Sequence, residues 1–378
     1  MRTPLSVVIG AGGTGGHIYP GLALAEALRR ADPDAVISFV GTTRGLEGEL
    51  IPAAGYRLHT VDMIPFDPAL GARRYLLPAA LLKSGAQCRA ILRDQRAQVA
   101  VGMGGYPSAP VILGARLAGL PSLIHESNAV PGRANQFAAR LTPHVAVAFD
   151  TGHLAGAATT GMPIAAALAA LGSLPGPGRA ALRAEARSAL GVPEGARLVL
   201  FNGGSLGAAR LTEAAVGLSH RWANRADVHL LVKTGPSALD TTARRLGPGA
   251  RAVAYLDRMD LAYAAADLVV CRAGSATVAE LATVGVPAVL VPYPHAPGDH
   301  QTHNARVLTD AGAGLLLADA DTTADRLAAL VEPLLTDPAR LAVMARAADP
   351  GPHARAAELL AERVVDLASH PYERQTAA

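Results

Sequence analysis

One local pattern occurs twice in this chain, and it constrains the fold more than any other feature. A short apolar run leads into a glycine-rich turn and then into a run of helix-forming residues. The apolar runs cover residues 5–9 and 198–201, and the turns cover residues 10–16 and 202–208. Strand–turn–helix units of this kind build parallel sheets with helices on both faces. The chain is therefore expected to hold two Rossmann-like α/β domains.

Further short apolar runs extend both sheets. They cover residues 36–40, 99–101, 122–124 and 145–147 in the first half, and residues 228–232, 268–270 and 288–291 in the second. Continuous apolar runs of this length, separated by connecting segments, are typical of parallel strands buried on both faces. The Gly- and Pro-rich loop at residues 172–178 follows a domain boundary expected near residue 160, and residues 353–370 predict a final helix.

Composition excludes several classes of protein. Half of the 378 residues are apolar and 17% are charged, which is enough apolar material for two large cores. No apolar stretch of membrane-spanning length lacks a charge or a Pro or Gly cluster, and the N-terminus lacks a signal-peptide pattern, so a cytoplasmic protein is expected. The two cysteines, Cys88 and Cys271, indicate neither a disulfide framework nor a zinc site. The net charge of +3 does not indicate a nucleic-acid partner.

The first glycine turn matches the G-x-G-x-x-G pattern of nucleotide-binding domains. Such a turn brings the backbone close to a phosphate, although a purely structural tight turn has the same sequence. A dinucleotide site needs an acid near the end of the second strand, where this chain has Gly41-Thr-Thr-Arg44. Arg44 suits a 2′-phosphate, so an NADP-dependent oxidoreductase is one alternative. Two phosphate-type turns on two domains favour instead a sugar nucleotide bound between them.

Three further positions carry candidate chemistry. His17 begins the helix after the first turn, where the helix N-terminus favours the neutral imidazole that a general base needs. Glu280 lies about one turn inside the helix that follows residues 271–274, where it is either a ribose ligand or a solvated helix acid. The polar residues 299–304 offer hydrogen bonds to sugar hydroxyls, or cap a helix. His300 and His303 lack the additional ligands of a zinc site.

Six motifs between residues 5 and 340 resemble, in order, those of the MurG family of N-acetylglucosaminyltransferases. They are Gly12-Gly-Thr-Gly-Gly-His17, Gly102-Met-Gly-Gly-Tyr-Pro107, His125-Glu-Ser-Asn128, Gly203-Gly-Ser-Leu-Gly-Ala208, Cys271-Arg-Ala-Gly274 with Glu280, and Asp299-His-Gln301. The family transfers GlcNAc from UDP-GlcNAc to lipid-linked muramoyl-pentapeptide in peptidoglycan synthesis, converting lipid I to lipid II. Several motifs in the right order are more specific than one glycine turn.

The resemblance implies the GT-B fold, in which two Rossmann-like doubly wound α/β domains face a cleft. Residues 1–160 would form the acceptor domain on the membrane side, residues 161–340 the UDP-sugar donor domain, and residues 341–378 a C-terminal helix that returns to the first domain. The implied reaction is a single inverting displacement. No cofactor and no metal are implied, because the family holds its diphosphate with helix N-termini and turn N–H groups.

The resemblance also assigns residues by motif. His17 would be the catalytic base, with Glu126 as an alternative base or an orienting partner. Tyr106 and Glu126 would lie on the acceptor side. The donor-binding residues would be Thr14, Gly15, Gly16, Asn128, Ser205, Leu256, Ser275, Ala276, Thr277, Glu280 and Gln301. Among these, Leu256 would meet the uracil through its backbone, Glu280 the ribose and Gln301 the GlcNAc hydroxyls.

Three positions depart from the family pattern. Met162 and Ala165 stand where the family has Asn and a phosphate-binding Arg, and Leu206 stands where it has Gln. The loss of a charged phosphate contact costs on the order of 1.5–3 kcal/mol. Two alternatives therefore stay open: a paralogue that glycosylates a specialised metabolite, and a catalytically inactive sugar-nucleotide-binding protein.

An anionic membrane surface is a further partner implied by the family. Residues 63–66 and 75–82 are apolar and are flanked by Arg73, Arg74, Lys83 and Arg89. This combination suits peripheral docking on the inner face of the cell membrane. An ordinary amphipathic core helix has the same pattern.

Overall fold

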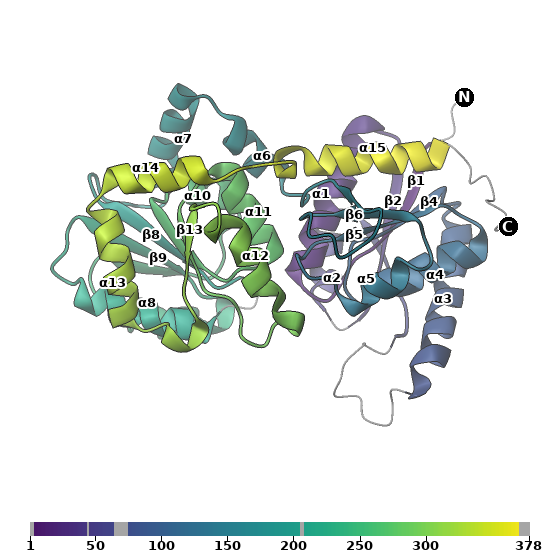
Figure 1. The fold of residues 1–378 in the computed structure, drawn as a ribbon, viewed down its shortest axis with the longest axis horizontal. Coiled ribbons are helices and arrows are strands. Elements are labelled where there is room, and N and C mark those ends of the chain that lie inside the picture. The colour runs from purple at the N-terminus through teal and green to yellow at the C-terminus, as the bar shows by residue number, and fades with distance from the viewer. Residues whose placement is uncertain (1–3, 44, 64–74, 205–207, 370–378) are drawn as a thin grey trace. The chain divides into compact units, whose positions relative to one another are not determined.

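The computed structural model describes residues 4–43, 45–63, 75–204 and 208–369, which divide into two compact units (Figure 1). Unit 1 contains Met1–Ala165 and Arg355–Ala378, and unit 2 contains Ala166–Ala354. No helix within the described residues has the length and apolar character needed to cross a membrane.

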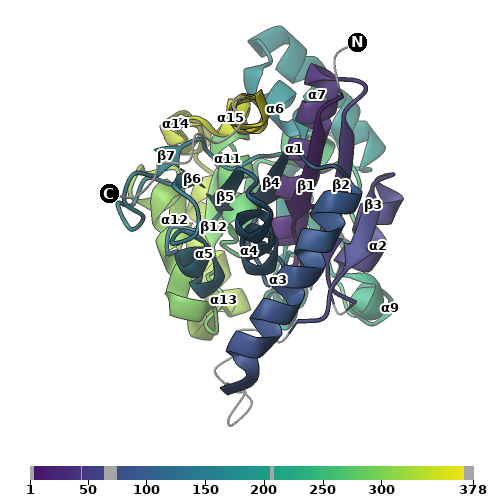
Figure 2. The ribbon, with the colours of Figure 1, turned by 90° about the vertical axis from the view of Figure 1, so that its right-hand side faces the viewer.

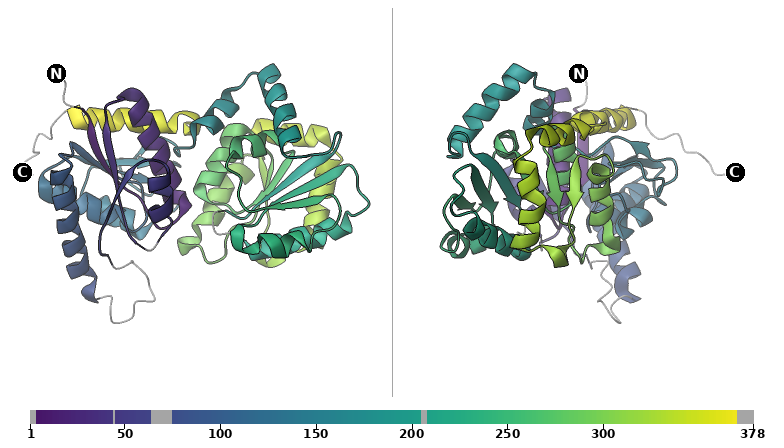
Figure 3. Two further views of the ribbon diagram at one scale, coloured as in Figure 1. Left: turned by 180° about the vertical axis from the view of Figure 1, so that it is seen from behind. Right: turned by 60° about the vertical axis from the view of Figure 1, so that its left-hand side comes forward.

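Unit 1 is built on a parallel sheet with the strand order β3-β2-β1-β4-β5-β6-β7 (Figure 3). The chain runs outward from β1 to β3 and then crosses back to β4, so the direction of winding reverses between β1 and β4. The register pairs Gly10 of β1 with Gly102 of β4, which aligns the carboxyl ends of these two strands. The strands are β1 (Ser6–Gly10), β2 (Val36–Gly41), β3 (Arg57–Thr60), β4 (Val99–Gly102), β5 (Ser122–Glu126), β6 (His144–Val147) and β7 (Ala158–Thr159).

Helices cover both faces of this sheet. They are α1 (Gly15–Ala31), α2 (Glu47–Ala53), α3 (Leu77–Asp94), α4 (Ser108–Ala118), α5 (Arg133–Ala138) and α15 (Ala356–Ser369). The last helix, α15, packs against α1, where Leu360 shares a core with Leu24 and Arg30 forms a 2.9 Å ion pair with Glu358. Figure 2 shows α3 beside α4. Gly114 has no side chain, and this allows the two helices to approach closely. A Cβ at this position would lie only 2.7 Å from the Cβ of Cys88.

Unit 2 repeats the same topology, with the strand order β10-β9-β8-β11-β12-β13 and all pairs parallel. The winding here reverses between β8 and β11. The strands are β8 (Arg197–Asn202), β9 (Val228–Lys233), β10 (Ala250–Val253), β11 (Leu268–Cys271), β12 (Ala288–Leu290) and β13 (Gly314–Leu316).

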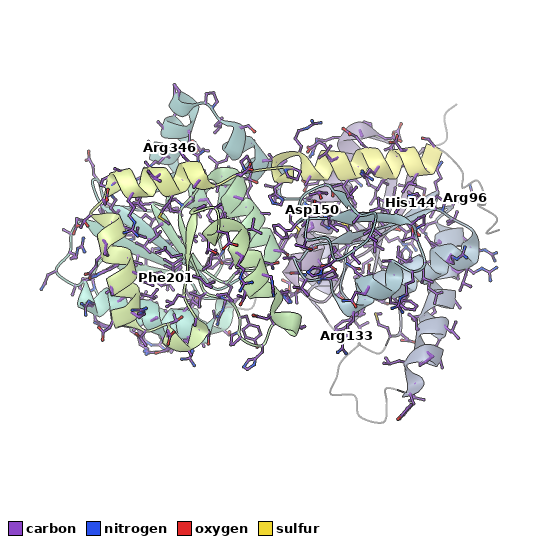
Figure 4. The ribbon with its side chains drawn as sticks, viewed as in Figure 1. Arg96, Arg133, His144, Asp150, Phe201 and Arg346 are labelled. Atoms are coloured by element: carbon purple, nitrogen blue, oxygen red, sulfur yellow. The ribbon has the colours of Figure 1, made fainter. Side chains whose placement is uncertain are left out.

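This second sheet carries a hydrophobic core in which Phe201 of β8 packs with Leu218, Leu327 and Met344 (Phe201 is labelled in Figure 4). The α-helices are α6 (Ala166–Ser173), α7 (Gly176–Ala189), α8 (Ala209–Arg221), α9 (Leu239–Ala243), α10 (Met259–Ala265), α11 (Ser275–Val284), α12 (His300–Thr309), α13 (Ala324–Leu335) and α14 (Pro338–Ala347). Short 3-10 helices are η2 (Pro236–Ala238), η3 (Pro297–Asp299), η4 (Asp319–Asp321) and η5 (His353–Arg355).

The boundaries expected from the sequence need correction. They lie after residues 160 and 340, whereas the structure divides after Ala165 and Ala354. Helix α14 belongs to unit 2 because Leu341 and Met344 are buried in the core of that unit. The helix that joins unit 1 is therefore α15 alone.

Candidate functional site

The candidate residues lie mainly at the carboxyl ends of the strands, near the points where the winding of each sheet reverses. In unit 1, the glycine turn at residues 11–14 follows β1, and a second glycine-containing loop at residues 103–107 follows β4. In unit 2, the corresponding segments follow β8 and β11. Ligands of open α/β sheets bind at such reversal points, because the two neighbouring loops diverge there and leave a crevice.

His17 lies in the first turn of α1 and packs against the loop that follows β4. Gly104 and Gly105 of this loop have φ values of 93° and 72°, in the left-handed region that favours glycine. A Cβ on Gly104 would lie 2.6 Å from Nδ1 of His17, and one on Gly105 would lie 3.2 Å from its Cδ2. The two glycines therefore make room for the imidazole, which keeps partial solvent exposure.

Glu47, which the sequence analysis missed, stabilises the first glycine turn through a hydrogen bond to its backbone. Its carboxylate is fully buried and accepts hydrogen bonds from Gly13 N–H (2.9 Å), Thr42 N–H (3.0 Å) and the Thr42 hydroxyl (2.7 Å). Burial alone raises the pKa of Glu47, but the hydrogen bonds from Thr42 and Gly13 outweigh it and hold the pKa below its usual value. An acid in the first turn of the helix after the second strand is the signal that marks this residue.

The same contact argues against a dinucleotide at this turn. A bound pyrophosphate would need the Gly13 N–H, which already donates to Glu47, and it would face a buried negative charge. Arg44, on which the NADP alternative also depended, lies outside the described residues.

Glu126 ends β5 and is 2% exposed. Its Oε1 accepts from the backbone N–H (2.8 Å) and side-chain amide (3.3 Å) of Asn128, and its Oε2 accepts from Gly132 N–H (3.0 Å) and the Asn135 amide (3.0 Å). Burial raises the pKa of Glu126, and these four bonds oppose the rise. Because both oxygens are occupied, the geometry fits the orienting role of Glu126 better than the role of base.

Asn135 and Ser108 extend this network toward His17, and the sequence analysis singled out neither. The Asn135 amide donates to the His125 carbonyl (3.0 Å), and its Oδ1 accepts from the Ser108 hydroxyl (3.3 Å). The Ser108 oxygen in turn accepts the Gly104 N–H (3.3 Å). The loop that contacts His17 is thus tied by hydrogen bonds to the loop that Glu126 orders.

The other predicted residues of unit 1 lie around these loops. Thr14 is exposed and precedes α1, Gly15 is buried, and Gly16 and Asn128 are partly exposed. Tyr106, at the end of the glycine-containing loop, is 38% exposed. These residues share the edge of the sheet at which β1, β4 and β5 end.

In unit 2, Glu280 of α11 lies in a group of polar side chains. The Tyr263 hydroxyl donates to its Oε2 at 3.0 Å, and Lys233, the last residue of β9, acts on it through its charge. Burial raises the pKa of Glu280 to about 7, while Tyr263 and Lys233 oppose the rise. Part of the side chain still reaches solvent, and its Oε1 has no hydrogen-bond partner in the part of the chain that the structure describes. This oxygen is available to a ligand hydroxyl.

The first turn of α11 consists of Ser275, Ala276 and Thr277, with Gly274 as the N-cap. The N–H groups of a first helical turn have no acceptor within the helix, and the helix dipole is positive there, so this turn suits a phosphate. The turn after β8 begins with Asn202, whose Oδ1 accepts Gly204 N–H at 3.1 Å. Ser205 and Leu206, which continue this turn, lie outside the described residues.

Leu256 and Gln301 complete the predicted donor residues. Leu256 follows β10 and is partly exposed; its neighbour Tyr255 has its ring 6.0 Å from the Lys233 ammonium. Gln301, in the first turn of α12, accepts Tyr293 N–H at 2.9 Å through Oε1. This bond leaves the Gln301 amide N–H groups free to donate.

Two Asp-x-Asp segments have structural roles. Asp32 accepts the backbone N–H groups of Leu5 and Asp34, both at 3.2 Å. Asp319 forms ion pairs with Arg272 (2.6 Å) and Arg210 (3.0 Å). Within the described ranges, no group of three or more His, Cys, Asp or Glu side chains is arranged to hold a metal ion.

Family models match both halves of the chain. The glycosyltransferase family 28 N-terminal domain matches residues 7–147, and the C-terminal domain of the same family matches residues 198–364. The chain belongs to glycosyltransferase family 28. The MurG resemblance predicted from the motifs is confirmed by curated relatives of nearly full length.

Two of these relatives are named UDP-N-acetylglucosamine–N-acetylmuramyl-(pentapeptide) pyrophosphoryl-undecaprenol N-acetylglucosamine transferase. One, from Mycolicibacterium paratuberculosis, is 42% identical over 371 residues, which cover 96% of this chain and 89% of the relative. The other, from Nocardioides sp., is 42% identical over 374 residues, covering 96% and 98%.

Solved structures agree with the fold class. MurG of Acinetobacter baumannii matches with a TM-score of 0.74 and 28% identity over 96% of this chain and all of that one. The glycosyltransferase of kitacinnamycin matches with a TM-score of 0.67 and 19% identity, a likeness that supports the fold only. The predicted GT-B class, with two Rossmann-like doubly wound α/β domains, is confirmed.

Proposed function

We propose that this enzyme transfers GlcNAc from UDP-GlcNAc to lipid-linked muramoyl-pentapeptide, converting lipid I to lipid II with inversion at the anomeric carbon. The observation that carries the proposal is the 42% identity, over nearly the whole chain, to relatives that bear this activity in their name. Residues of both domains contribute to the predicted site, so similarity over both halves supports it more strongly than a match to one domain.

His17 is the proposed base in this reaction. It removes the proton of the attacking acceptor hydroxyl as the new bond to the anomeric carbon forms and the bond to UDP breaks. A neutral imidazole suits this role, and its position at the start of α1 favours that form. Glu126 orders the adjacent loop through its four hydrogen bonds and is a positioning residue.

Unit 2 is proposed to bind the donor. Glu280 accepts hydrogen bonds from the ribose hydroxyls, and the N–H groups in the first turn of α11 bind the diphosphate. The Gln301 amide donates hydrogen bonds to the transferred sugar. These N–H groups are fixed before the reaction and stabilise the leaving charge without reorganisation, so we propose that the step needs no metal. Ala165 has no charge to offer the phosphate, whereas Lys233 ends β9 at this edge of the sheet, where burial lowers its pKa and the charge of Glu280 opposes that shift.

The test is UDP release from UDP-GlcNAc, with and without a short-chain lipid-linked muramoyl-pentapeptide, with the product checked by mass. The proposal expects acceptor-dependent release and a product heavier by one N-acetylhexosamine. UDP binding without transfer to this acceptor would contradict it, and a panel of natural-product acceptors would then separate a paralogue from an inactive binding protein. The His17→Ala variant is the control for release that does not depend on the site.

We further propose that the enzyme docks peripherally on the anionic, cytoplasmic face of the membrane. The apolar side chains Tyr75 and Leu76, just before α3, and Leu82, within it, are 74%, 57% and 60% exposed, and Lys83 follows Leu82 in the chain. Other residues of α3, among them Gly85 and Cys88, are buried against α4. Ile64, Pro65, Phe66, Arg73 and Arg74, which belong to the same predicted patch, lie outside the described residues.

Vesicle flotation tests this docking. Leu76→Glu should reduce binding to vesicles that contain phosphatidylglycerol, because it places a charge in the apolar patch. Leu117→Glu is the matched control, since Leu117 lies on α4 and is 44% exposed. Equal binding by both variants would contradict the proposed patch.

A further inference from the structure

A hollow lies in unit 2, at the opposite edge of the sheet from Glu280. Its volume is about 390 Å³, and it lies among α7, α10, α14 and the residues just before β11 and β12 (these helices are labelled in Figure 1). Arg197 begins β8, Asp267 precedes β11 and Pro287 precedes β12, so the hollow is at the amino ends of these strands. We call it the α7–α14 pocket.

One wall of this pocket is unusually basic. Arg179 and Arg183 of α7 and Arg197 of β8 line it, and Arg187 follows on α7 at the same four-residue spacing, outside the lining. Asp267 is the carboxylate that they share, and it lies 2.9 Å from Arg183, 2.9 Å from Arg197 and 3.4 Å from Arg187. Burial lowers the pKa of Arg179, and the charge of Arg183 lowers it further.

The other charges near this wall do not neutralise it. Asp260 forms an ion pair with Arg258 at 2.6 Å, and Glu185, which is exposed, acts on the same Arg258. Arg183 also donates to the carbonyls of Ala264, Ala265 and Ala266. Carbonyl oxygens satisfy N–H groups but remove no net charge. Like charges four residues apart on a helix repel each other. The arginines share one carboxylate, that of Asp267, so their positive charges are only partly neutralised.

Donor groups remain for a ligand. Within the described residues, the guanidinium group of Arg197 donates only to Asp267, and that of Arg179 only to the Val284 carbonyl. Both residues line the pocket. Their remaining N–H groups can therefore bind an oxyanion in the forked geometry that guanidinium groups favour.

The opposite wall is apolar and comes from α14, through Pro338, Leu341, Ala342 and Ala345. Gly285, with φ of 66°, lies between the walls. A Cβ there would lie 3.2 Å from the Ala345 carbonyl, so the glycine allows α14 to approach closely. A ligand that fits both walls has an anionic group and an apolar body, and the volume is in the range of small-molecule sites.

We propose that the α7–α14 pocket binds a small organic phosphate, with its phosphate group held by Arg179 and Arg197 beside the charge of Arg183 and its apolar part against α14. The site is separate from the proposed diphosphate site, which lies at the carboxyl edge of the same sheet. Bound phosphate supplies the negative charge that Asp267 alone does not.

The experiment is calorimetric titration of the full-length enzyme with phenyl phosphate and with inorganic pyrophosphate, in the absence and presence of saturating UDP. Binding should be saturable, should persist with UDP, and should weaken about tenfold or more in Arg179→Met and Arg197→Met. Arg346→Met is the matched control, because Arg346 is an exposed arginine of α14 outside the pocket lining (Figure 4). The Arg346→Met variant should bind phenyl phosphate and pyrophosphate with the affinity of the wild type.

The proposal is overturned if no saturable binding occurs up to about 10 mM ligand, or if the three variants bind equally. Unfolding temperatures identify any variant that fails to fold, and Arg197→Lys, which keeps the charge, should then give intermediate affinity. Flotation with anionic vesicles distinguishes the source of the phosphate: an effect of Arg197→Met on vesicle binding would assign a lipid headgroup and overturn the soluble ligand. None of these readouts depends on transferase activity, so failure here is distinguishable from failure of the proposed function.

Discussion

Replacement of Glu47 by Gln should destabilise the first glycine turn and, with it, the placement of His17. The Glu47 carboxylate accepts three hydrogen bonds in a fully buried position. A Gln side chain can keep the two bonds from Thr42 on its oxygen. Its NH₂ group would then face the Gly13 N–H, so that two donors meet where a donor and an acceptor met before.

The magnitude follows from these contacts. Hydrogen bonds to a charged group contribute about 1.5–3 kcal/mol each, and a buried donor without a partner costs about 1–3 kcal/mol. One bond is lost and two are weakened by the loss of charge, so Glu47→Gln should lower the free energy of unfolding of unit 1 by about 2–4 kcal/mol at neutral pH. Turnover should fall as well, because the turn leads directly into His17.

Urea unfolding followed by circular dichroism, from neutral pH to about pH 4, measures the effect. The pKa of Glu47 is lowered from 4.5, so its contribution to stability is present above that value and is lost as the pH falls through the folded-state pKa. The difference between wild type and Glu47→Gln should therefore shrink in acid. Glu49→Gln is the control, since Glu49 is exposed on the same helix. Equal unfolding midpoints for the two variants at neutral pH would refute the reasoning.

Four further predictions concern the candidate sites of the two units. His17→Ala should lower turnover by about two to four orders of magnitude while UDP still binds, and unchanged turnover would remove His17 from the mechanism. Gly104→Ala should lower turnover and should lower stability by about 1–3 kcal/mol, because φ is 93° and the new Cβ would lie 2.6 Å from Nδ1 of His17. Thermal unfolding and UDP release measure the two effects, with Gly48→Ala as the control because Gly48 of α2 faces open space. Equal effects of the two substitutions would contradict this prediction. UDP affinity should fall as the pH falls through about 7, because protonated Glu280 accepts fewer hydroxyl hydrogen bonds. Tyr263→Phe should move that midpoint upward by removing a bond that lowers the Glu280 pKa, and a titration with an unshifted midpoint would show that Tyr263 does not position Glu280.

The buried strands of both sheets were predictable, and those at the edges were not. Every apolar run predicted as a strand is confirmed as one, because a strand covered on both faces needs apolar side chains throughout. The missed strands were β3, β7, β10 and β13, which lie at or beside sheet edges. Arg57-Leu-His-Thr60 of β3, for example, is only half buried and has no apolar run. Its pairing with β2 defines it as a strand.

The site divides in the same way. The glycine turns between strands and helices led to His17 and Glu280, and the family motifs led to Glu126 and Gln301, because both kinds of pattern are local in the sequence. Glu47 is marked only by its position in the first turn of α2, and Asn135 and Tyr263 carry no such pattern. Their roles arise from contacts with residues 34, 27 and 17 positions away, respectively. Pattern reasoning cannot recover contacts of that separation.

The sequence by itself determined the alternation of strands and helices, the two glycine turns and the family, since these depend on local propensity and on motifs in a fixed order. The tertiary structure alone decided which carboxylates hold the loops, because a buried acid takes its pKa and its role from the donors that folding brings to it. The resemblance implied a returning helix from residue 341, and the structure decided that α15 alone completes unit 1. Its apolar residues require a core to pack against, and that core is formed by α1, more than three hundred residues earlier.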